Sequence, residues 1–153
     1  MKIKIGDQIP AFKSTDQDGN IITTENLKGK KLILFFYPKD DSPGCTKEAC
    51  NLRDNYNMFK KNGFTIFGIS PDTEKKHKKF IEKYEFQFSL IADPNREIID
   101  SFGLYGPKKF MGKDVIGVYR TTVVTDENLN ITHILDKVKT DEHAAQLAEA
   151  LQF

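Results

Sequence analysis

Short apolar runs between turn residues divide the chain into predicted strands. Residues 31–37 and 64–70 are almost continuously apolar, too short for a helix and too uniform for a half-exposed strand. Such runs predict central strands that are buried on both faces of a sheet. Shorter apolar or β-branched stretches predict further strands over residues 21–23, 88–92, 120–125 and 131–135. Residues 3–12, which Gly6 and Pro10 interrupt, predict a short strand that runs into extended chain.

Other stretches carry apolar residues every three or four positions, which is the period of an α-helix. This period predicts a helix over residues 43–61, ended by Asn62-Gly63. Residues 104–117 contain three glycines and one proline, and predict a long surface loop. Further helices are predicted over residues 71–84, 96–102 and 141–151, the last with Thr140 as its N-cap.

The order of these elements, ββαβαβαββα, predicts the fold class. Strands that alternate with helices form a parallel sheet, and the late hairpin extends it with antiparallel strands. Helices must then cover both faces of one mixed sheet. We therefore expect an α/β, thioredoxin-like fold with an N-terminal β extension. The 153 residues hold no repeat and no linker, so we expect one domain over residues 1–153.

The charge balance and the length of the apolar runs argue against nucleic acids and membranes as partners. Lys and Arg number 23 against 22 Asp and Glu, so the chain lacks the basic excess of a nucleic-acid-binding protein. The longest apolar run, residues 32–37, is far below the ~20 residues that span a bilayer. Residues 1–6 lack the apolar core of a signal peptide. We expect a cytoplasmic protein without a membrane or nucleic-acid partner.

The candidate chemistry lies just after the first buried strand, where open α/β sheets bind their ligands. Ser42 and Pro43 have the residue types of an N-cap and a first helical position, which places Cys45 in the first turn of the next helix. Free amides and the positive end of the helix dipole favour a thiolate there. The thiolate is the form that attacks electrophiles. The sequence therefore predicts that Cys45 is a nucleophile.

The position of Cys50 predicts a conformational change. Five helical residues rise ~7.5 Å and turn ~140°, which separates the two Cα atoms by roughly 8 to 9 Å. A disulfide needs Cα atoms no more than about 7 Å apart. A bond between Cys45 and Cys50 therefore requires the helix to unwind.

Structural alternatives exist for these residues. Both thiols could be small buried apolar groups, as most free cysteines are. A zinc site needs closely spaced ligands, but the three histidines are scattered, so we expect no metal. His77 and His143 are expected to be solvated helix residues, and His133 a strand-edge residue. No glycine-rich phosphate loop follows a predicted strand, and we expect no cofactor.

Residues 37–50 resemble the thioredoxin-dependent peroxiredoxins, in particular the bacterioferritin comigratory protein and peroxiredoxin Q group. The family pattern Pro-x₃-Thr/Ser-x₂-Cys is met by Pro38, Ser42 and Cys45. The subgroup context, which includes Pro-Gly-Cys at Gly44, is met through Cys50, and the resemblance covers essentially the whole chain. Ser42 stands where many members have threonine, which keeps the hydroxyl and loses a methyl group.

The resemblance implies a monomeric peroxidase that reduces hydrogen peroxide and organic hydroperoxides. Cys45 would be the peroxidatic cysteine and Cys50 the resolving one, with thioredoxin as the reductant of their disulfide. Arg120 matches the family arginine and would hold the thiolate and polarise the peroxide.

Other site residues have expected roles as well. Ser42 and Gly44 are expected at the substrate, and Pro38 would shape the loop and exclude water. Glu48 could affect local proton movements or be an ordinary acid of the first turn.

Two other functions use the same cysteines. A thiol–disulfide oxidoreductase of the thioredoxin type has this fold but uses Cys-x₂-Cys, a spacing that is absent here. A non-enzymatic redox-sensing module would use the cysteine pair to change a binding surface. Catalytic turnover with a reductase separates the enzyme from the sensor.

Overall fold

A five-stranded mixed sheet forms the centre of the computed structural model, which describes residues 1–153. Its strand order is β5-β4-β3-β8-β9, in which β3, β4 and β5 are parallel and β8 and β9 are antiparallel. These strands are β3 (Lys31–Phe36), β4 (Phe64–Ser70), β5 (Ser89–Ala92), β8 (Thr121–Thr125) and β9 (Ile131–Leu135). The expected mixed sheet, with parallel central strands and an antiparallel hairpin, is confirmed.

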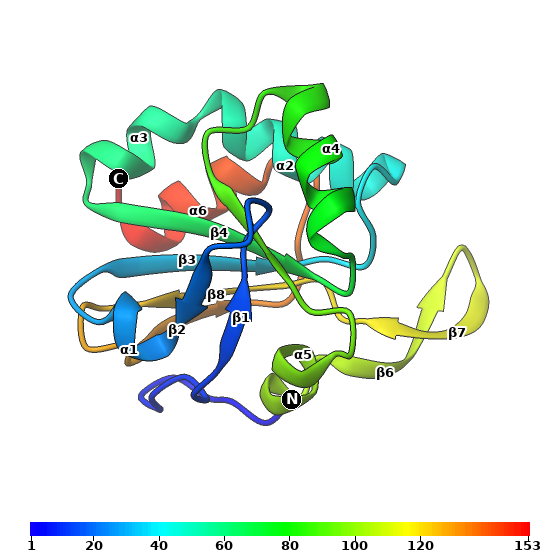
Figure 1. Ribbon diagram of the computed structural model, residues 1–153, viewed down its shortest axis with the longest axis horizontal. Helices are drawn as coiled ribbons and strands as arrows, with labels where there is room; N and C mark the ends of the chain where they lie inside the picture. Colours follow the sequence, from blue (N-terminus) through cyan, green and yellow to red (C-terminus); the bar gives the residue numbers. More distant parts are fainter.

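Helices cover both faces of this sheet (Figure 1). One face carries α2 (Pro43–Asp54), α3 (Tyr56–Lys61), α4 (Glu74–Tyr84) and α6 (His143–Leu151); the other carries α1 (Thr24–Leu27), α5 (Glu97–Phe102) and the N-terminal segment. Successive residues of β3 alternate between two apolar cores, because Leu34 faces one core and Phe35 the other. None of the helices is both long and apolar enough to cross a membrane.

The N-terminal strand lies later in the chain than expected. Residues 3–12 form no strand; β1 (Lys13–Thr15) pairs instead with β2 (Ile21–Thr23), which is the expected β extension. Gly6 has φ of +97°, and Pro10 cannot donate a backbone hydrogen bond, so the earlier segment cannot form a regular ladder. It still buries Ile9, whose amide donates to the carbonyl of Leu129.

The helix expected over residues 43–61 is divided at Asn55. The Asn55 side chain donates to the carbonyl of Asn51 at 2.8 Å, and its backbone leaves the helical region. The C-terminal helix begins at His143 rather than Asp141, and Thr140 is not its N-cap. Asn51 performs this role from α2, because its Oδ1 accepts from the amide of Ala144 at 2.7 Å.

The prediction of a surface loop over residues 104–117 is wrong. This segment is a hairpin of β6 (Tyr105–Phe110) and β7 (Lys113–Val118). Met111 and Gly112 both have positive φ, 52° and 79°, as a two-residue type I′ turn requires. The other two glycines, Gly106 and Gly117, pair with each other across the hairpin. Glycine content indicated a loop here, although one glycine makes the turn and two lie within strands.

Gly68 is expected to be essential for sheet packing. A Cβ on Gly68 would lie 2.6 Å from Leu90 Cδ2 and 2.8 Å from Phe35 Cζ. We predict that Gly68→Ala lowers the free energy of unfolding by about 1–3 kcal/mol through overpacking, measured by urea denaturation. The control is Gly117→Ala, whose Cβ would approach Lys108 Cε no closer than 3.5 Å. Equal losses in the two variants would contradict this packing account.

Candidate active site

The first turn of α2 holds Cys45 at the carboxyl end of β3, as expected. Ser42 occupies the N-cap position with extended backbone, and Pro43 is the first helical residue. The Ser42 hydroxyl makes no capping bond; it donates to the carbonyl of Lys39 at 3.0 Å. Cys45 is buried, with 1% of its surface exposed, and both cysteines are free thiols in an intact helix.

Arg120 connects this turn to the neighbouring strand. It lies one residue before β8, not within the expected strand, and the register pairs Thr121 with Phe36 near the end of β3. The guanidinium Nη2 donates to Cys45 Sγ at 3.4 Å, while Nη1 donates to Glu48 Oε1 at 2.8 Å. The planar fork of arginine suits such a double contact, which a lysine could not make. Arg120 therefore bridges the thiol and a carboxyl group.

Gly44 makes the approach of this guanidinium possible. A Cβ at Gly44 would lie 3.3 Å from Arg120 Nη2 and 3.9 Å from the Thr140 methyl group. The first contact is tighter than side chains normally tolerate, so a larger residue would displace the guanidinium. Gly44 thus belongs to the site through its missing side chain.

The second partner of Arg120, Glu48, is completely buried. Its Oε2 has no hydrogen-bond partner and lies 3.6 Å from His143 Nε2. Burial raises the pKa of Glu48 to about 7, against the opposing charge and hydrogen bond of Arg120. The pKa of Arg120 is raised, because Cys45 and Glu48 outweigh the effect of its burial. Arg120 is therefore the permanent charge of the site, whereas Glu48 can exchange a proton near neutral pH.

His143 is buried, so its expected solvated position is wrong. It is the first residue of α6, and its Nε2 lies 2.7 Å from the Thr122 hydroxyl. Its Nδ1 lies 3.0 Å from Gln146 Oε1. Burial lowers the pKa of His143. Residue spacing does not signal this position, because it depends on how α6 packs against α2 and β8. His133, by contrast, lies on β9, the last strand of the sheet, as expected.

Lys108 is a second cation at the site that the sequence did not indicate. It lies on β6 and donates to the Val118 carbonyl at 2.6 Å. Burial and then the charge of Arg120 lower the pKa of Lys108, while Cys45 raises it. The β6–β7 hairpin determines where Lys108 lies. Because a loop was predicted over this segment, Lys108 could not be assigned to the site from the sequence.

Cys50 lies further along α2 and is half-buried. Burial raises the pKa of the Cys50 thiol; Arg53 lowers it, and the carboxylates of Asp54 and Asp41 raise it. The surroundings of Cys50 thus favour the neutral thiol, whereas Cys45 faces a guanidinium.

The loop between β3 and α2 is fixed by a buried hydrogen-bond cluster. Pro38 is half-buried, and the preceding Tyr37 donates its hydroxyl proton to Asp40 Oδ1 at 2.5 Å. Asp40 Oδ2 lies 2.7 Å from His77 Nδ1, and His77 Nε2 lies 3.0 Å from the carbonyl of Ile91. His77 is fully buried, so its expected solvated position is also wrong. The cluster ties the loop to α4.

Asp40, Asp72 and His77 are close enough together to bind one metal ion. However, Asp72 Oδ2 accepts from the Ser70 hydroxyl at 2.7 Å and from the Asp40 amide at 2.8 Å. Together with the bonds of His77, these contacts occupy the ligand atoms with partners from the protein. The arrangement serves as a structural connection between loop and helix.

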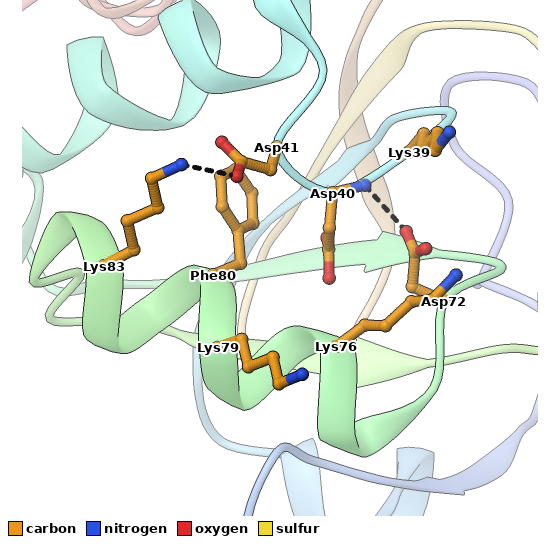
Figure 2. A pocket seen from close by; sticks show the side chains of 8 residues that line it. All are labelled: Lys39, Asp40, Asp41, Asp72, Lys76, Lys79, Phe80 and Lys83. Carbon is orange, nitrogen blue, oxygen red and sulfur yellow. Dashed lines mark hydrogen bonds and ion pairs between the residues drawn. The ribbon is translucent and has the colours of Figure 1, made fainter.

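Two pockets border these elements. A pocket of about 330 Å³ lies between the loop and α4 and does not include the Cys45 site (Figure 2). Another, of about 540 Å³, opens onto Arg120. The first is lined by Lys39, Asp40, Asp41, Asp72, Lys76, Lys79, Phe80 and Lys83. The second is lined by Met1, Lys108, Tyr119, Arg120, Thr121, Asp136, Lys137 and Val138. The pocket at Arg120 gives solvent and small molecules access to the guanidinium.

Comparison with known proteins assigns the chain to a family. Residues 5–134 match the AhpC/TSA family. The chain belongs to this family. A putative peroxiredoxin Bcp of Coxiella burnetii is 40% identical over 151 residues, which are 99% of this chain and 100% of that protein.

Two solved structures of family members are similar throughout. The bacterioferritin comigratory protein of Xanthomonas campestris, studied for alkyl peroxide reduction, is 30% identical over 92% of this chain and 90% of its own, with a TM-score of 0.84. Peroxidoxin BcpB of Mycobacterium tuberculosis is 32% identical over 98% and 97% of the chains, with a TM-score of 0.85. The chain is therefore a peroxiredoxin, a thiol peroxidase with a thioredoxin-like fold.

The buried carboxyl group of Glu48 predicts a pH dependence of stability. Its pKa is about 7 in the folded chain and 4.5 as the reference value, so the folded state binds more protons between these values. Its contribution is fully present below about pH 4.5 and is lost as pH rises through about 7. We predict that the stability of the wild type relative to Glu48→Gln falls by roughly 3 kcal/mol across this range.

Urea denaturation of both proteins at a series of pH values measures this difference. Taking the difference removes groups that titrate alike in both proteins. A difference that is constant with pH would show that Glu48 keeps its proton equilibrium on folding.

Proposed function

We propose that Cys45 is the peroxidatic nucleophile and that Arg120 activates it. The observation that carries the proposal is the contact between Arg120 Nη2 and Cys45 Sγ at 3.4 Å, in the first turn of α2. The guanidinium and the free amides of this turn stabilise negative charge on the sulfur. No other cysteine of the chain faces an arginine donor at hydrogen-bond distance.

The reaction is an in-line displacement at the peroxide. The Cys45 thiolate attacks one oxygen; an S–O bond forms, the O–O bond breaks, and the other oxygen leaves with the electron pair. The leaving oxygen takes up one proton, and the products are a sulfenic acid on Cys45 and water or an alcohol. Arg120 stabilises negative charge at both ends of the displacement. The pocket that opens onto Arg120 admits the substrate.

The remaining site residues shape this environment. Ser42 orders the turn before the helix through its bond to Lys39, and its hydroxyl is able to contact the peroxide after a rotation of the side chain. Gly44 leaves space for the guanidinium, and Pro38 shapes the loop and excludes water. Hydrogen peroxide and organic hydroperoxides are the proposed substrates; alkyl peroxide reduction by the Xanthomonas campestris relative supports the second class.

Cys50 is the proposed resolving cysteine. Its thiol condenses with the sulfenic acid, which forms a disulfide and releases water. The first turns of α2 must unwind for this bond, since the intact helix separates the two residues too widely. Asn51 bonds α6 and the segment just before it: its Nδ2 donates to the Asp141 carbonyl at 3.1 Å, and its Oδ1 accepts from the Ala144 amide of α6 at 2.7 Å. These bonds would hold the remainder of α2 while its first turns open.

A dithiol protein closes the cycle by thiol–disulfide exchange. We propose thioredoxin as this reductant, the cytoplasm as the compartment, and a monomer in which residues 1–153 act as one domain. The two free thiols fit a reducing compartment.

Oxidation of single-cysteine variants tests the two assignments. We predict that one equivalent of hydrogen peroxide converts the reduced wild type rapidly to an internal disulfide. Cys50→Ser should react equally fast but stop at a sulfenic acid on Cys45, since no resolving thiol is present. Cys45→Ser should show no fast reaction. Stopped-flow loss of peroxide and intact mass of the protein measure these outcomes.

Slow oxidation that is unchanged in Cys45→Ser would contradict the proposal. Turnover with thioredoxin and its reductase separates a peroxidase from a redox sensor, because a sensor would be oxidised once without sustained peroxide consumption.

A further inference from the structure

Glu48 and His143 form a buried pair that the proposed displacement leaves unused. Neither side chain is exposed to solvent. Glu48 Oε2 has no hydrogen-bond partner, and His143 Nε2 lies 3.6 Å from it. Burying a carboxylate oxygen without a donor is costly, so this position needs a proton.

The hydrogen bonds around His143 determine where its first proton lies. Gln146 Oε1 accepts from the Lys139 amide at 2.9 Å, and Gln146 Nε2 donates to the Lys137 carbonyl at 2.9 Å. These contacts fix the orientation of the amide, so Oε1 faces His143 Nδ1 as an acceptor. Nδ1 therefore carries a hydrogen, and Nε2 is the atom that gains or lacks the second proton.

A proton on Glu48 Oε2 removes the negative charge from a buried oxygen that has no donor. Without it, an ionised Oε2 lies 3.6 Å from the lone pair of Nε2, which accepts its hydrogen bond from the Thr122 hydroxyl at 2.7 Å and has no proton to donate. With it, the pair is neutral whether the proton lies on the carboxyl or on the imidazole. Burial raises the pKa of Glu48 and lowers that of His143, which favours the carboxylic acid with a neutral imidazole.

The charge of Arg120 links this proton to the sulfur. The ionisable groups around Glu48 are Arg120 from the start of β8, His143 from α6, and Cys45 from its own helix, with Lys108 of β6 beside Arg120. A protonated Glu48 leaves the guanidinium to pair with the Cys45 thiolate. Once Cys45 has lost its negative charge, an ionised Glu48 becomes the anion that pairs with Arg120.

We propose that the Glu48–His143 pair holds one proton in the reduced enzyme and gives it up when Cys45 is oxidised by the peroxide. The inference rests on the proposed role of Cys45. In this step the S–O bond forms and the O–O bond breaks; the leaving oxygen gains one proton and Glu48 loses one. The net charge of the site stays constant, because the negative charge moves from sulfur to Glu48. His143 is a positioning residue that acts through Glu48.

Infrared difference spectroscopy tests the proposal in the Cys50→Ser background, which stops at the sulfenic acid. Near pH 6, the reduced-minus-oxidised spectrum should show the carbonyl band of a protonated carboxylic acid that is lost on oxidation. The band should be absent when Glu48→Gln is added. Adding His143→Gln should lower the pH at which the band fades by about one unit, because the glutamine amide can donate a hydrogen bond to an ionised Oε2, which the lone pair of Nε2 cannot.

His133→Gln is the matched control, since His133 hydrogen-bonds Thr132 on β9 and does not contact the site. It should leave the band and its pH dependence unchanged. A merely structural role of His143 would reduce folding or rate without moving this pH dependence. The intact mass of each sample is also measured, because it reports oxidation of Cys45 independently of the proton on Glu48.

A gain of one oxygen on Cys45 without loss of a carboxylic acid band would contradict the proposed loss of a proton from the Glu48–His143 pair, but not the proposed peroxidase function. A band that persists in Glu48→Gln would also contradict this loss of a proton. Failure of Cys45 to gain oxygen would instead contradict the proposed function.

Discussion

Arg120 carries one positive charge between two groups that can each be negative, the sulfur of Cys45 and the carboxyl of Glu48. A single half-buried cation can neutralise only one of these two buried groups fully, so protonation of Glu48 and the charge on sulfur are coupled. The fold creates this coupling through strand pairing. Because β8 runs antiparallel to β3, the residue before β8 arrives where β3 leads into α2. The resulting contacts join the start of an inner strand, β8, to the first two turns of α2.

The same turn must be rigid for attack and must open for disulfide formation. Rigidity before α2 comes from the bond of Asp40 to His77 and from the bonds of Asp41 to Lys83 and Tyr84, all on α4. Asn51 secures α2 on the far side of Cys50. Residues 43–50 therefore lie between two anchored points. Opening confined to this stretch would leave the sheet and one apolar core in place, and would remove only Cys45 and Ala49 from the other core.

The central strands and the position of Cys45 could be predicted from residues that are neighbours in the sequence. The central strands follow from continuous apolar runs, and the place of Cys45 follows from Ser42 and Pro43 just before it. Arg120 could be assigned to the site only from the family resemblance, because it approaches the thiol through the pairing of β8 with β3, which residue spacing does not predict. Burial of His77 and His143 and the position of Lys108 depend on tertiary packing, which residue spacing does not encode. The β6–β7 hairpin was not predicted, because glycine occurs both in loops and in strands whose backbones approach closely.

The central claim is that the guanidinium of Arg120 activates Cys45. The most direct measurement is the second-order rate constant of Cys45 oxidation by hydrogen peroxide in Arg120→Met and Arg120→Lys, with circular dichroism to confirm folding. We expect a loss of roughly 100-fold or more in Arg120→Met, as for removal of other charge-stabilising donors. Arg120→Lys should recover only part, because it keeps the charge but not the fork. A loss below about threefold in the folded Arg120→Met protein would contradict the claim.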